Sequence, residues 1–147
     1  MDDIIYTGIF FEFSEERREM LEWITEGDWM PNKFAHHITL QFRPKSGSEH
    51  VDWVVKNQGL EVTVTATGST HPGQNVAAIS VEIPPEIAEH CTNKTPHLTI
   101  ATAEGVRPFE ANNATYDPFE IPKGSVTFTR FELTGKVGFF LKGERNV

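Results

Sequence analysis

The chain has 147 residues, 38% of them hydrophobic and 23% charged, a size and balance that predict one globular domain spanning 1–147. Its formal net charge is −8 and it has no cluster of Lys and Arg, which argues against a protein that grips a long polynucleotide. No apolar run approaches the roughly 20 residues that span a bilayer, the first residues lack the pattern of a secretory signal peptide, and the lone Cys91 has no partner for an internal disulfide. These features predict a cytoplasmic protein that does not associate with membranes.

In the first half of the chain, apolar periodicity and capping residues predict alternating strands and helices. The expected elements are a strand over 4–13, a helix between Ser14 and Gly27, a strand over 35–42 and a short helix over 49–57. Ser14 is a suitable N-cap because its hydroxyl accepts a hydrogen bond from a free backbone N–H, and Gly27 is a typical helix stop. In the second helix, the spacing of Val51, Val54 and Val55 predicts that these side chains turn inward.

The second half of the chain is richer in strand and turn signals. The expected elements are a strand over 60–67, a loop over 68–75, a strand over 76–83, a short helix from 84 to 91, a strand over 95–102, an irregular segment over 107–118, and a hairpin of strands 125–133 and 136–142 that turns at Thr134 and Gly135. The order strand, helix, strand occurs in 4–42 and again in 76–102. This repeat predicts an α+β fold in which two β–α–β units are related by a pseudo-twofold axis.

Two segments of the chain nearly repeat each other: His37-Ile38-Thr39-Leu40 and His97-Leu98-Thr99-Ile100. Successive side chains of a strand point to opposite faces, so the His and Thr of each segment share one face and the apolar residues face a core. Two such strands lying side by side present two imidazoles and two hydroxyls to one cleft. For either histidine alone, a structural role in a strand is the alternative explanation.

Paired imidazoles suit the cleavage of a phosphodiester, because an imidazole titrates near neutral pH. One histidine can take a proton from the attacking water or ribose hydroxyl while the other donates a proton to the leaving oxygen. Hydroxyls of the motif threonines can bind the non-bridging oxygens and stabilise charge in the transition state. The candidate catalytic residues are therefore His37, Thr39, His97 and Thr99; strand geometry leaves open which histidine is the acid.

We expect no metal ion or other cofactor at this site. His36 and His37 are adjacent, so in a strand they face opposite ways and cannot join one coordination sphere, and no further ligands at zinc spacing are present. Three other residues are candidates for binding a substrate: Tyr6 and Phe139 by stacking on a base, and Arg107 by clamping a phosphate. Core packing of the rings and an ordinary exposed loop arginine are the alternatives.

The paired motifs resemble those of the 2H phosphoesterase superfamily, which is defined by two His-x-[Ser/Thr]-x segments. The resemblance implies a two-lobed, pseudo-symmetric LigT-like α+β fold, with antiparallel sheets around a central cleft and flanking helices. It also implies metal-independent cleavage of cyclic or 2′,5′-linked phosphodiesters. The segment from Gly105 to Asn113, after the second motif, is similar to the branch that contains the phosphodiesterase domain of tRNA ligases and the phage anti-CBASS nucleases. The latter degrade the cyclic di- and trinucleotide signals of bacterial immunity.

The acidic net charge favours a small cyclic oligonucleotide as the substrate over a longer strand. Two alternatives remain: an RNA 2′,3′-cyclic phosphodiesterase that processes RNA ends, and a non-catalytic protein that sequesters a nucleotide. If the resemblance to the phage nucleases extends to the source, the protein acts in the host cytosol. The sequence contains no signal for an oligomeric state.

Overall fold

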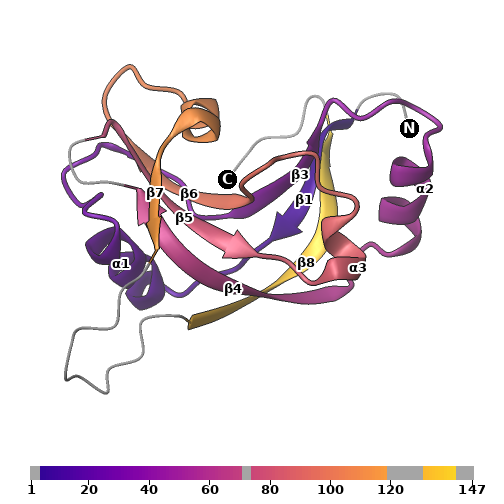
Figure 1. Cartoon of the computed structure of the whole chain (residues 1–147), viewed down its shortest axis with the longest axis horizontal. Helices are drawn as coiled ribbons and strands as arrows, with labels where there is room; N and C mark the ends of the chain where they lie inside the picture. Colours follow the sequence, from indigo (N-terminus) through magenta and orange to yellow (C-terminus); the bar gives the residue numbers. More distant parts are fainter. Residues whose placement is uncertain (1–3, 71–73, 119–130, 142–147) are drawn as a thin grey trace.

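Antiparallel strands account for most of the fold in a computed structural model that describes residues 4–70, 74–118 and 131–141 (Figure 1). The strands are β1 (Ile4–Phe10), β2 (Asn32–Lys33), β3 (His37–Phe42), β4 (Glu61–Thr70), β5 (Val76–Glu82), β6 (His97–Thr102), β7 (Tyr116–Pro118) and β8 (Phe131–Leu141). The α-helices are α1 (Glu15–Ile24), α2 (Glu49–Lys56) and α3 (Pro85–Ala88), and a 3-10 helix, η1, spans Pro108–Asn113. The predicted α+β class is confirmed. Within the described ranges, no helix is long and apolar enough to cross a membrane.

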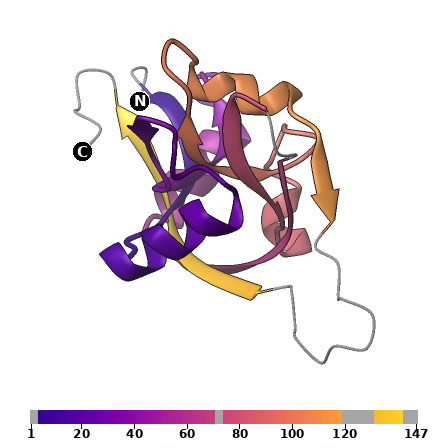
Figure 2. The same ribbon diagram turned by 90° about the vertical axis from the view of Figure 1, so that its left-hand side faces the viewer.

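Six strands close into a barrel. They follow the order β6-β3-β1-β8-β4-β5, and β5 pairs with β6 to complete the ring. Short strands extend it: β2 pairs with the end of β6, and β7 pairs with β4. We expected separate antiparallel sheets around a cleft, whereas the described strands form one sheet, because β6 pairs with β3 on one side and with β5 on the other. The helices lie outside the barrel, with α1 and α2 near its opposite ends (Figures 1 and 2).

The order of the strands is symmetric about the β3–β6 pair. Moving away from that pair, one meets β3, β1 and β8 in one direction and β6, β5 and β4 in the other. In chain order, α1 lies between β1 and β3, and α3 lies between β5 and β6. The repeat of strand, helix and strand that we predicted is therefore present, and it brings the two motif strands together as neighbours in the barrel.

The apolar residues of both motifs lie in the core. Ile38, Leu40, Leu98 and Ile100 have almost no exposed surface and belong to one cluster of buried side chains. Other fully buried members of this cluster are Ile9, Leu21, Val54, Val64, Ala66, Ala77, Ile79 and Ala101. The alternation predicted from the motif sequences is confirmed, so the histidines and threonines lie on the opposite face of the sheet.

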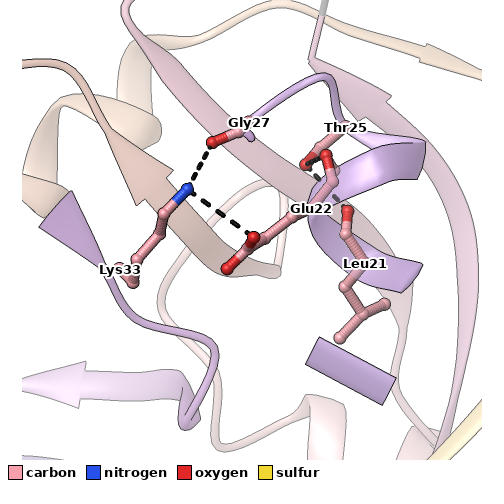
Figure 3. A network of polar contacts seen from close by, with 5 residues as sticks. All are labelled: Leu21, Glu22, Thr25, Gly27 and Lys33. Atoms are coloured by element: carbon pink, nitrogen blue, oxygen red, sulfur yellow. Dashed lines mark hydrogen bonds and ion pairs between the residues drawn. The ribbon is translucent and has the colours of Figure 1, made fainter. Parts of the chain in front are cut away.

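A polar network fixes the chain between α1 and the first motif strand. Ser14 caps α1 as predicted, its hydroxyl accepting a hydrogen bond from the third residue of the helix. At the other end, Lys33 donates to the Gly27 carbonyl oxygen at 2.8 Å and pairs with Glu22 at 3.6 Å (Figure 3). A Cβ added to Gly27 would lie 2.8 Å from that of Ala77, so this turn packs directly against β5. The network holds β2 and the following residues along the edge of β6.

Two loop predictions are wrong in part. Residues 68–70 continue β4, because Gly68 and Thr70 pair with Pro118 and Tyr116 of β7. The segment 107–118, expected to be irregular, contains η1 and β7. Partners distant in sequence decide both cases, and local turn signals contain no information about them. Residues 71–73 of the expected loop lie outside the described residues.

The side chains that α2 buries differ in part from those predicted. Val51 and Val54 are buried as expected, but Val55 is 44% exposed. His50 faces inward instead, where its Nε2 lies 2.6 Å from the Thr7 hydroxyl oxygen and its Nδ1 lies 3.3 Å from Nδ1 of His90. A polar side chain occupies this interior position because it has hydrogen-bond partners there.

The predicted hairpin turn at Thr134-Gly135 is wrong. A single strand, β8, runs through both positions, and it pairs with β4 at Thr63 and Val62. Gly135 serves close packing, because a Cβ there would lie 2.6 Å from the Phe10 carbonyl oxygen. The glycine thus lets β1 approach β8 inside the ring. Residues 125–130 of the expected hairpin lie outside the described residues.

Gly135→Ala is therefore expected to destabilise the protein by about 1–3 kcal/mol, because the added methyl group meets backbone that cannot move without opening the barrel. The measurement is the free energy of unfolding in urea. Gly138→Ala is the matched control, since its Cβ would meet only the edge of the Phe10 ring at 3.2 Å. Equal stability of the two variants would contradict this account of β8.

Candidate functional site

A cavity of about 650 Å³ lies against the motif strands, and it contains both histidines and both threonines of the motifs. It is lined by Tyr6, Phe34, His36, His37, Thr39, Leu40, Phe42, Thr92, Asn93, His97, Thr99, Pro108 and Asn112. Beside β6, the segment around η1 (orange in Figure 1) provides one wall. Asn93 donates to the Asn112 side-chain oxygen at 3.3 Å and joins that wall to the segment before β6. The size suits a nucleotide-sized ligand.

The register of the two motif strands explains how the four polar residues meet. Ile38 of β3 lies opposite Leu98 of β6 in an antiparallel pair. His37 and Thr39 flank Ile38 on β3, and His97 and Thr99 flank Leu98 on β6, so all four polar residues lie beside this pair and line the cavity. The two histidines are close to each other across this pair, because His97 contributes to lowering the pKa of His37. A phosphate between them can contact both imidazoles and both hydroxyls.

The hydrogen bonding of His97 fixes its protonation pattern. Its Nδ1 lies 2.8 Å from the Thr95 carbonyl oxygen, which can only accept, so Nδ1–H is the donor. Nε2 is therefore the nitrogen that gains or loses a proton when the ring titrates, and it is an acceptor in the neutral ring. Burial lowers the pKa of His97, while the hydrogen bond to the Thr95 carbonyl favours the charged ring and opposes this effect.

His37 is in a different environment. Its ring stacks on Tyr6, with 4.4 Å between the ring centres, and Phe10 flanks it at 5.7 Å. Burial, with the neighbouring His36 and His97, lowers the pKa of His37 to about 3. With this lowered pKa, His37 is neutral at physiological pH.

His36 also lines the cavity, which corrects the prediction that it faces away from His37. The two Nδ1 atoms are 2.6 Å apart and the rings stack at 4.7 Å. The reason is a local bulge. The Ala35 N–H donates to the Thr99 carbonyl, and Ile38 pairs with Leu98. The chain therefore advances three residues from Ala35 to Ile38 while β6 changes by only one, and the extra residues bulge out. Ala35 takes a positive φ of 72° in this bulge, and strict alternation begins only with β3. Because one Nδ1 must donate and the other accept, the protons of the two rings are linked.

Of the three residues predicted to bind substrate, one lines the cavity and two do not. Tyr6 lines the cavity. Phe139 does not; it packs against the core cluster, while its neighbour Phe140 stacks on Tyr6 with 5.2 Å between ring centres. Arg107 is exposed and precedes Pro108, which does line the cavity, but Arg107 itself does not.

Sequence reasoning missed several residues of the cavity. Phe42 ends β3 and is 65% exposed at the cavity, an unusual position for a large aromatic side chain. Phe34, Asn93 and Asn112 also line it, and no local pattern marks them. Arg18 donates to the Phe34 carbonyl at 2.7 Å and lies close enough to His36 to help lower its pKa, after burial. A positive charge therefore lies next to the cavity of this acidic protein.

Within the described ranges, no group of three or more His, Cys, Asp and Glu side chains gathers in a way that suits a metal ion. A second histidine pair does exist outside the cavity: His50 and His90 meet beside Trp53, whose ring stacks on His90 at 4.0 Å. Burial, followed by the nearby His90, lowers the pKa of His50 to about 4.

These buried histidines predict that stability falls in mild acid. In the folded protein the pKa values of His37 and His50 lie below their unfolded value near 6.5, so the folded state binds fewer protons. Their contribution to the free energy of unfolding is complete above pH 6.5. It is lost as the pH falls, at up to about 1.4 kcal/mol per pH unit for His37. Thermal melts should give a lower Tm at pH 5 than at pH 6.5, a window above the titration of ordinary carboxylates. In His50→Gln, which removes one titrating ring, the dependence should be shallower; an unchanged slope would contradict the role of His50.

No family model matches the chain, and no curated protein matches its sequence. The geometry of the cavity and the two motifs are therefore the features of this chain that point to a function.

Proposed function

We propose that this protein is a metal-independent phosphodiesterase of the 2H type that hydrolyses cyclic oligonucleotides in the cytosol. The observation that carries the proposal is the meeting of His37, Thr39, His97 and Thr99 in one cavity, on adjacent antiparallel strands. The alternation of side chains along a strand does not by itself bring the His and Thr residues of two separate strands to the same cavity. A base, an acid and two hydroxyl donors around one phosphorus suit the acid–base cleavage of a phosphodiester.

The different environments of the two histidines support separate roles. His37, neutral with its lowered pKa, is the general base that takes a proton from the attacking water or ribose hydroxyl. His97, whose Nδ1–H donates to the Thr95 carbonyl, is the general acid that delivers the Nε2 proton to the leaving oxygen. The negative charge of a bound phosphodiester raises the pKa of both imidazoles, and the hydrogen bond to the Thr95 carbonyl, which also favours the charged ring, makes His97 the one that takes up the proton more readily.

The threonines complete the mechanism. Thr39 and Thr99 flank the space between the rings and donate hydrogen bonds to the non-bridging oxygens, where charge grows during attack. Tyr6, which stacks on His37, holds that ring in place. In this scheme the site reaches its full activity with protein groups alone.

The choice of a cyclic oligonucleotide rests on charge and shape. The net charge of −8 disfavours a long strand, and a cavity of about 650 Å³ holds a compact ligand. The symmetric order of strands about the β3–β6 pair supports the finer assignment, a LigT-like pseudo-symmetric fold. On this proposal the chain resembles the phage nucleases that remove cyclic nucleotide signals.

The test is turnover in excess EDTA. The protein is incubated with cyclic dinucleotides and cyclic trinucleotides, and the products are followed by chromatography beside a His37→Ala/His97→Ala double variant purified in the same way. We expect linear products from the unmodified protein alone. Turnover restricted to RNA 2′,3′-cyclic phosphate ends would reassign the protein to RNA end processing. Stoichiometric binding in calorimetry, with the ligand unchanged after hours, would make it a sequestering protein.

A further inference from the structure

A second hollow, of about 440 Å³, lies next to His97, since three of the residues that line it neighbour or contact this histidine. Its residues come from four segments: Thr67 of β4, Ser80 and Val81 of β5, Lys94 to Pro96 before β6, and Ala114 with Tyr116 near β7. Of these residues, the mechanism above uses only Thr95, whose carbonyl accepts a hydrogen bond from His97.

Three contacts connect this hollow to His97. Ser80 is the register partner of His97 in the β5–β6 pair. The ring of Tyr116 faces the His97 ring, with 5.9 Å between their centres. The Thr95 carbonyl accepts the Nδ1–H bond of His97. His97 therefore lines the main cavity and also contacts residues that line the second hollow.

The chemistry of the second hollow suits a sugar–phosphate unit. Among the described residues that line it, Lys94 is the one with a cationic side chain. The hydroxyl oxygens of Thr67 and Ser80 lie 3.0 Å apart, and Thr67 also donates to the Ser80 carbonyl at 3.2 Å. A cation beside a pair of hydroxyls matches a phosphate oxygen next to a ribose hydroxyl.

We propose that the second hollow is a subsite for the sugar–phosphate unit on the leaving-group side of the scissile bond. This inference rests on the proposed function and deepens it. His97 protonates the leaving oxygen, so the part of the substrate attached to that oxygen begins next to His97 and extends away from the scissile phosphate. The hollow next to His97 is where the next sugar and phosphate lie, with Lys94 on the phosphate. The substrate class that follows has at least two phosphodiester groups, which excludes a mononucleotide as the preferred substrate.

The test compares two ligands in the inactive His37→Ala background, where no turnover disturbs calorimetry. Cyclic di-adenylate has a second phosphate, whereas 2′,3′-cyclic adenylate has none. Lys94→Gln should raise the Kd for cyclic di-adenylate roughly five- to tenfold and leave the Kd for 2′,3′-cyclic adenylate unchanged. Thr67→Val should have a smaller effect in the same direction. Lys56→Gln, at the end of α2, is the control that removes the same charge elsewhere.

An equal Kd for cyclic di-adenylate in Lys94→Gln and Lys56→Gln would overturn the subsite, as would equal weakening of both ligands by Lys94→Gln. The absence of any binding of cyclic di-adenylate would overturn it too. The proposed function has a separate readout, turnover by the unmodified protein in EDTA. A protein that cleaves cyclic di-adenylate but is indifferent to Lys94→Gln would keep the function and lose the subsite.

Discussion

Replacing His37 or His97 with alanine is expected to lower kcat for a cyclic dinucleotide by roughly 10²–10⁴, the usual contribution of one general acid or base. The fold should survive both changes, because each ring lies on the cavity side of its strand while the neighbouring Ile38 and Leu98 provide the core contacts. The double variant should be little worse than either single one, since the two groups act in one concerted step. Steady-state kinetics and circular dichroism together check the prediction.

His90→Gln is the matched control for these variants. His90 is a histidine in contact with another histidine, but it lies outside the cavity. Its replacement should leave kcat within about twofold while it alters stability through the contact with Trp53. Near-native kcat in either His37→Ala or His97→Ala would exclude the two-histidine mechanism.

The combined change Thr39→Val and Thr99→Val is expected to lower kcat by roughly 10²–10³ or more, with a smaller effect on KM. Each substitution removes a hydroxyl that donates to charge developing on the phosphate, and valine keeps the shape of threonine. Because the loss is specific to the transition state, it should appear in kcat.

Thr65→Val, the same substitution on β4 outside the cavity, is the control for shape and strand propensity. It should leave kcat unchanged. A threonine double variant that raises KM alone would instead assign the hydroxyls to ground-state binding.

The sequence predicted the faces of the two motif strands because a strand alternates with a fixed period of two. That period places Ile38 and Leu98 in the core without any knowledge of the partner strands. It also predicted the start of α1, since Ser14 has the side chain that a helix N-terminus requires. Local rules of this kind need only neighbouring residues.

The errors arise where contacts distant in sequence decide the conformation. His36 reaches the cavity because of a bulge that depends on the register of β3 against β6. Alternation predicts that Phe139 and Phe140 face opposite sides, but the pairing of Phe140 with Tyr6 across β1 and β8 decides which one approaches the site. Register is fixed by the whole barrel, and the sequence of one strand does not contain it.

The wrong prediction of a turn at Gly135 also arises from a contact distant in sequence. Threonine followed by glycine between two apolar runs is a reasonable hairpin signal, and the structure uses the glycine for close packing against Phe10 instead. A hairpin turn and the close packing of two strands both favour glycine, because it has no side chain. Only the position of β1, more than a hundred residues earlier, distinguishes them.

In the proposed mechanism His37 and His97 act on one phosphorus atom, and a crystal structure of the protein with a slowly cleaved phosphorothioate cyclic dinucleotide would show whether they do. We predict one phosphate group in the cavity with both imidazoles within about 2.6–3.2 Å of its oxygens and the motif hydroxyls on its non-bridging positions. A ligand bound on another surface, or a phosphate that contacts only one of the two histidines, would contradict the account.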